Sequence, residues 1–80
     1  MEYQEVEKKI REFLTVEFEI NDEILKPEAD LKNDLGIDSL DFVDISVTIE
    51  NSFGFKISAE EIKNLKSYED FCKTIHKKTL

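Results

Sequence analysis

The sequence predicts an all-α fold, a four-helix bundle of three longer helices and one short helix, with a long loop between helices 1 and 2. Apolar residues recur at helical spacing in the longer segments, and residues that cap helices stand at their ends. No two segments alternate in polarity as paired strands do. The 80 residues correspond to a single domain, 1–80, and such a chain buries about 60% of its unfolded surface.

Composition restricts the function classes. The 40% of hydrophobic residues predict a folded chain, although 38% of the residues are charged. A net charge of −8 argues against binding to nucleic acid or anionic lipid, because both need phosphate neutralisation by Lys and Arg. Basic surfaces on other proteins are the natural complement.

The sequence offers no sign of export or membrane insertion. The single cysteine, Cys72, cannot form an internal disulfide. No apolar run approaches the ~20 residues that span a bilayer, and the first five residues lack the apolar region of a signal peptide. We expect a cytoplasmic monomer without a membrane span.

The first helix is predicted at about residues 2–15. Its apolar residues are Tyr3, Val6, Ile10, Phe13 and Leu14. The i,i+4 pairs Glu5–Lys9 and Glu7–Arg11 predict solvated ion pairs that support the helix. Residues 15–20 alternate in polarity as a strand does, but a lone strand is not stable. We therefore expect the helix to continue past Leu14 and to end in an ordered loop.

Residues 21–34 are predicted to form a long connection. Pro27 breaks any helix there, and loops of this length are usually functional or disordered. Regularly placed apolar residues favour an ordered loop that is held against the bundle. The predicted anchors are Ile24, Leu25, Leu31 and Leu35. Gly36 then suits a positive-φ turn position.

The second helix should begin with Asp38 as N-cap and Ser39 at its first position, and Asp41 should lie in its first turn. It should end near Phe53, followed by Gly54 at the C′ position. At about 100° per residue, its apolar side chains form two stripes on roughly opposite sides. The inward stripe is Phe42, Ile45, Ile49 and Phe53, and the outward stripe is Leu40, Val43 and Val47.

The outward stripe has two interpretations. Three aliphatic residues can simply lie partly exposed or under a loop. Alternatively, they form a small apolar patch for docking basic partners. Residues 33–55 contain five acids and neither lysine nor arginine, whereas a merely solvated surface usually mixes both signs. This imbalance favours the docking patch.

Two further helices are predicted. Ser58 and Glu61 have the spacing of a capping box, before a short helix at about 59–64 with Ile62 and Leu65 facing inward. Ser67 should cap a final helix. Its apolar stripe is Tyr68, Phe71, Cys72 and Ile75, and Lys73, Lys77 and Lys78 gather toward its end.

The residues do not predict an enzyme or a metal site. The only histidine, His76, lies near the C-terminus, Cys72 lies on an inward stripe, and two glycines cannot make a phosphate loop. A calcium loop needs ligands at alternate positions around a central glycine. The acids Asp34, Asp38, Asp41 and Asp44 instead have the spacing of a helix face.

Ser39 remains as a possible attachment point. A hydroxyl at the start of a helix is exposed, and the backbone N–H groups there favour a phosphate. The neighbouring aspartates repel a phosphodiester, so such a site would project its cargo outward. The plainer interpretation is a serine that caps the helix or faces solvent.

The stretch Leu35-Gly36-Ile37-Asp38-Ser39-Leu40-Asp41, followed by Val43-Asp44 and then Phe53, resembles the signature of the acyl carrier proteins. Asp-Ser-Leu alone is a weak match. The upstream Leu-Gly, the helical pattern that follows and the helices capped by Ser58 and Ser67 make it specific. The resemblance extends from Val6 to about Ile75 and fits the length and acidity of the chain.

This resemblance implies a carrier that catalyses nothing. It implies that a phosphopantetheinyl transferase (holo-ACP synthase) modifies Ser39 with 4′-phosphopantetheine, whose thiol then holds acyl groups as thioesters. The implied pathway is fatty-acid or related lipid or polyketide biosynthesis. Ketosynthases, acyltransferases and other thioester-processing enzymes would bind through basic patches. The implied partner face is Asp38, Leu40, Asp41, Val43, Asp44, Val47 and Glu50.

Phe42 departs from the small or polar residue that is common at its position in this family. We hypothesise that it fills space where an acyl chain would lie. The candidate acyl-pocket residues are Phe42, Ile45, Ile49 and Ile62. Two alternative functions are a specialised carrier for an aminoacyl or other non-fatty-acid cargo and an unmodified acidic module that uses the outward stripe only for docking.

Overall fold

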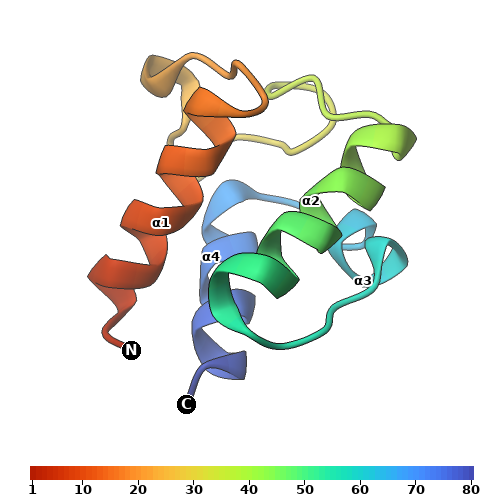
Figure 1. The fold of residues 1–80 in the computed structure, drawn as a ribbon. Helices are drawn as coiled ribbons and strands as arrows, with labels where there is room; N and C mark the ends of the chain where they lie inside the picture. Colours follow the sequence, from red (N-terminus) through yellow and green to blue (C-terminus); the bar gives the residue numbers. More distant parts are fainter.

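A computed structural model describes all 80 residues and confirms the predicted all-α fold (Figure 1). Its helices are α1 (Tyr3–Val16), α2 (Ser39–Phe53), α3 (Ala59–Lys63) and α4 (Tyr68–Lys78), together with a short 3-10 helix, η1 (Asp22–Ile24). Helix α1 packs against α4, and α2 packs against the short α3. No strand forms, and one isolated bridge joins Asp30 to Ser67. No helix has the length and apolar character needed to cross a bilayer.

The end of α1 confirms that the helix continues past Leu14. It ends at Val16, and the N–H of Glu17 still donates to the carbonyl of Phe13 at 2.9 Å. The chain then turns through Glu19, whose φ of 56° lies in the left-handed region, and buries Ile20. The alternation over 15–20 therefore reflects a helix end and a turn.

The long connection is held against the start of α4. The N–H of Leu31 donates to the carbonyl of Lys66 at 3.1 Å, and the N–H of Tyr68 donates to that of Ala29 at 2.8 Å. Leu25, Leu31 and Leu35 are buried as predicted. The prediction for Ile24 was wrong: this residue is 40% exposed and lies in η1, a helix that was not predicted from the sequence.

The two ion pairs predicted within α1 have different outcomes. Arg11 contacts Glu7 at 2.9 Å as predicted, but it also binds Asp22 at 2.7 Å and the carbonyl of Leu25 at 3.0 Å. This pair is therefore part of a network that fastens η1 to α1. Lys9 does not pair with Glu5, because its ammonium extends to α2 and donates to the carbonyl of Ser52 at 3.4 Å.

The short helix α3 begins as predicted, although its capping is simpler. Ser58 Oγ accepts a hydrogen bond from the N–H of Glu61 at 3.1 Å. The reciprocal half of the predicted capping box is absent, because the Glu61 carboxylate pairs with Lys78 of α4 at 3.2 Å. The helix ends at Lys63, and Asn64 is its C-cap.

One core unites the four helices. All 19 buried residues belong to a single cluster, and no buried side-chain polar atom lacks a hydrogen-bond partner. The termini lie at the same end of the bundle (Figure 1), where His76 Nε2 lies 3.0 Å from the carbonyl oxygen of Met1. The start of α2 lies toward the opposite end, beside the long connection.

Candidate functional site

Two aspartates hold the start of α2. Asp38 is the N-cap, with φ of −103°, and its Oδ1 accepts from the N–H of Asp41 at 3.0 Å. In return, Asp41 Oδ2 accepts from the N–H of Asp38 at 3.3 Å. The predicted cap is confirmed, and the reciprocal bond makes it a full capping box. Both carboxylates are thereby committed to the backbone.

Ser39 lies immediately inside this cap with its hydroxyl free. The side chains of Ser58 and Ser67 accept cap hydrogen bonds at the starts of α3 and α4. The Asp38 carboxylate performs that role for α2, so the exposed Ser39 hydroxyl forms no hydrogen bond. The N–H groups of Ser39 and Leu40 also have no acceptor. A free hydroxyl beside two free N–H groups suits a phosphate ester.

The outward stripe of α2 is exposed as predicted. Leu40 is 76% exposed, Val43 50% and Val47 55%. Of the acids around it, Asp38 and Asp44 are exposed, and Asp41 and Glu50 are half-buried. None of these acids forms an ion pair. Their charge is therefore uncompensated within the chain and available to a basic partner.

The inward side of α2 is closed. Phe42, Ile45, Ile49 and Ile62 are each no more than 2% exposed. A groove of about 420 Å³ opens beside Ser39 between the start of α2 and α3. Its lining is Ser39, Phe42, Ala59, Glu60, Lys63 and Asn64. The groove therefore reaches Phe42 and does not extend to Ile45, Ile49 or Ile62.

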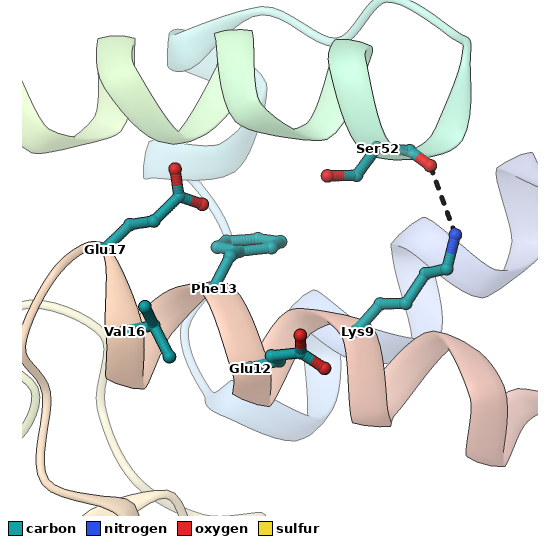
Figure 2. A pocket seen from close by; sticks show the side chains of 6 residues that line it. All are labelled: Lys9, Glu12, Phe13, Val16, Glu17 and Ser52. Carbon is teal, nitrogen blue, oxygen red and sulfur yellow. Dashed lines mark hydrogen bonds between the residues drawn. The ribbon is translucent and has the colours of Figure 1, made fainter.

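A second hollow, of about 390 Å³, lies between α1 and the end of α2 (Figure 2). Lys9 reaches across it to the carbonyl of Ser52, and its ammonium lies 5.5 Å from the centre of the Phe53 ring. The rise of 1.5 Å per residue places this end of α2 about 20 Å from Ser39. The Lys9 contact offsets the negative end of the α2 dipole. The charged side chain in this hollow therefore has a structural role.

The reactive side chains outside the start of α2, Cys72 and His76, are packed against other parts of the structure. Cys72 is fully buried, and burial raises the pKa of its thiol to about 12, so it stays protonated at neutral pH. His76 packs edge-on against Tyr3. No group of three or more metal-ligating side chains gathers in the structure.

Comparison with known proteins identifies the family. The model of the family described as "Phosphopantetheine attachment site" matches residues 8–75. The acyl carrier protein of Coprothermobacter proteolyticus is 38% identical over 68 residues, which are 85% of this chain and 78% of that protein. This chain belongs to the acyl carrier protein family.

Two further acyl carrier proteins support the membership. That of Phytoplasma mali is 39% identical over 84% of this chain and 80% of its own length. That of Thermosynechococcus vestitus is 32% identical over 98% of this chain and 96% of its own. Members of the family are carriers and not catalysts, and their cofactor is 4′-phosphopantetheine. They work with a phosphopantetheinyl transferase and with acyl-processing enzymes.

The start of α2 in this carrier fits the cofactor, because it offers an unoccupied hydroxyl and unpaired N–H donors within one turn. Lys63 and Asn64, which the structure places in the groove beside Ser39, were not predicted from the sequence. Both follow Ser39 by more than 20 residues. Only the packing of α3 against α2 brings them there, so no local pattern could have identified them.

Proposed function

We propose that Ser39 is the residue to which 4′-phosphopantetheine is attached. The observation that carries this proposal is the division of roles at the start of α2. Asp38 supplies the N-cap, which leaves the Ser39 hydroxyl exposed and without a hydrogen bond. The position of Ser39 in the stretch that resembles the family signature supports the same residue.

In the proposed reaction, Ser39 Oγ attacks the phosphorus that bears the pantetheine of coenzyme A. A new Oγ–P bond forms, the pyrophosphate P–O bond breaks, and adenosine 3′,5′-bisphosphate leaves. The hydroxyl proton passes to a base of the transferase. Once attached, the arm supplies a terminal thiol that carries acyl groups as thioesters. The carrier contributes the hydroxyl and the free N–H groups at the helix start.

We further propose that the exposed stripe and its acids form the docking face for the partner enzymes. Leu40, Val43 and Val47 supply the apolar contact. The acidic side chains around them are Asp38, Asp41, Asp44 and Glu50. Acids without an internal partner favour enzymes that present basic patches, because complementary charge speeds association and suppresses wrong partners.

The proposed pathway is fatty-acid biosynthesis or the synthesis of a related lipid or polyketide. Phe42 affects which cargo can enter the core, because it lines the groove, is only 2% exposed, and is followed by no deeper lining residue such as Ile45, Ile49 or Ile62. A chain that enters the core toward Ile45, Ile49 and Ile62 must therefore displace it. We propose that the carrier acts as a monomer in the cytoplasm, where the buried thiol of Cys72 stays reduced.

Intact-mass measurement tests the attachment. The protein is incubated with coenzyme A and a broad-specificity phosphopantetheinyl transferase, beside Ser39→Ala and Ser52→Ala. The second variant is a matched control, because Ser52 is also an exposed α2 serine with an unbonded hydroxyl. The wild type and Ser52→Ala should gain the mass of one phosphopantetheine, and Ser39→Ala should gain none. No gain in the wild type, or a gain in Ser39→Ala, would overturn the proposal.

A further inference from the structure

The groove beside Ser39 carries a positive charge that the motif around Ser39 lacks. Lys63, the last residue of α3, lines this groove together with the exposed Asn64. Residues 33–55 contain no lysine or arginine. Lys63 is therefore the one cationic side chain in the lining, beside a single acid, Glu60.

Lys63 is also uncommitted. It forms no ion pair and donates no side-chain hydrogen bond, whereas Lys73 and Lys78 each pair with a glutamate. An exposed ammonium remains free to bind an anion that arrives next to it. The nearest position at which this protein acquires an anion is Ser39, because a phosphodiester there carries one negative charge at neutral pH.

The side chains next to Ser39 are unfavourable for the negative charge of an attached phosphodiester. Asp38 and Asp41 flank it, and although both carboxylates accept backbone hydrogen bonds, their charges remain and repel a phosphate. The free N–H groups of Ser39 and Leu40 offset this only partly. A lysine in the same groove supplies the missing positive charge.

We propose that the groove holds the proximal part of the phosphopantetheine arm and that Lys63 pairs with its phosphodiester. This inference rests on the attachment at Ser39 proposed above. Asn64 can exchange hydrogen bonds with the hydroxyl and amide groups of the arm. The apolar lining residues, Phe42 and Ala59, suit the two methyl groups that follow the phosphate.

The position of the arm in the groove would leave the outward stripe of α2 free for docking. Phe42 and the outward stripe lie on different sides of α2, since Leu40 and Val43 are exposed whereas Phe42 is buried. An arm held on the Phe42 side leaves the outward stripe open to partner enzymes. Lys63 thus acts as a positioning residue for the arm and takes no part in chemistry.

Nuclear magnetic resonance of the loaded protein tests the contact. Amide shifts are compared before and after loading for the wild type, Lys63→Glu, Lys63→Arg and Lys66→Glu. Lys66 is a matched control, because it is exposed and unpaired but does not line the groove. Loading should shift the Glu60 and Asn64 amides in the wild type, in Lys63→Arg and in Lys66→Glu. In Lys63→Glu these shifts should fall about two- to fivefold, as expected for an exposed ion pair.

The ³¹P resonance of the phosphodiester gives a second readout. It should move as salt rises toward about 1 M in the wild type, and much less in Lys63→Glu. A loaded wild type without shifts at Glu60 and Asn64, or with equal shifts in Lys63→Glu, would overturn the Lys63 contact alone. Failure to load at all would instead overturn the attachment at Ser39, and this inference with it.

Discussion

Asp38 and Asp41 each accept a hydrogen bond from the other's backbone N–H, at 3.0 and 3.3 Å, and so close the first turn of α2. This pairing leaves the capping of α2 to the two aspartates, so Ser39 is not needed as a cap. The aspartates stabilise the start of the helix, and the hydroxyl between them has no structural role. Modification of the Ser39 hydroxyl would therefore break no hydrogen bond of the fold.

The cap itself should be measurable by mutation. Asp38→Ala removes the acceptor for the Asp41 N–H and should cost about 1 kcal/mol of unfolding free energy, which corresponds to a decrease in Tm of about 4–8 °C in a domain of this size. Asp38→Asn keeps an acceptor and should cost only a few tenths of that. Urea unfolding measures both variants. Equal losses in the two would show that the hydrogen bond is not what stabilises the helix start.

The proposed docking face should affect binding but not folding. Val47→Ser removes apolar contact from a side chain that is 55% exposed, so its effect on stability should stay within about 0.5 kcal/mol. The KM of a partner transferase should rise about fivefold or more, which corresponds to a loss of about 1 kcal/mol of binding.

Val16→Ser is the matched control for that experiment, because Val16 is 72% exposed but lies on α1. Its KM should equal that of the wild type. Val47 lies two turns of helix beyond Ser39, so a change at Val47 cannot act directly on the proposed attachment site. A KM unaffected by Val47→Ser would remove that residue from the docking face.

Phe42 should limit access to the core. In an octanoyl-loaded wild type, the methyl resonances of Ile45 and Ile49 should move little, because the groove is lined by the buried Phe42 and does not extend to either isoleucine. In Phe42→Leu the same resonances should move clearly. The variant should remain folded at a cost of about 1–2 kcal/mol, which is less than the 3–5 kcal/mol typical of Phe→Ala. Clear shifts in the wild type would contradict this role.

Alkaline pH should weaken the fold through Cys72. Burial raises the pKa of its thiol to about 12 in the folded protein, whereas an unfolded cysteine has a pKa of about 8.5. The protonated, folded thiol therefore contributes stability that is complete below the unfolded value and is lost as pH rises toward 12. Glu7 also raises this pKa, whereas Tyr68, Arg11 and Tyr3 lower it.

The comparison that isolates this effect is Cys72→Ala. The variant should be less stable at pH 7, because it leaves a small cavity in the core. Between pH 9 and pH 10 the gap in unfolding free energy between wild type and variant should narrow by about 1 kcal/mol. Urea midpoints at pH 7, 9 and 10 measure it. A gap that stays constant over this range would contradict the raised pKa.

Much of the fold follows from local rules that can be applied to the sequence. Asp38, Ser58 and Ser67 were each predicted as caps, and each accepts the expected hydrogen bond. The two stripes of α2 were predicted from helical spacing: Phe42, Ile45 and Ile49 are buried, Phe53 is partly buried, and the outward stripe is exposed. Such features depend on residues within about four positions of one another, where backbone geometry alone sets the neighbours.

The predicted side-chain pairs failed where a long charged side chain can reach both a local and a distant partner. Glu61 was expected to complete its capping box but pairs with Lys78 of α4. Lys9 was expected to pair with Glu5 but reaches Ser52 of α2. Long side chains can exchange one exposed partner for another at little cost, since such pairs differ by less than about 1 kcal/mol.

The sequence by itself determined the helices, their caps, the exposed stripe and the serine between two aspartates, because periodicity and capping act over a single turn. Only the tertiary structure decided what surrounds that serine. The packing of α3 against α2 forms the groove, whose lining combines Ser39 and Phe42 of α2 with Lys63 of α3. These residues lie far apart in the chain, and burial of a shared apolar core is what brings them together.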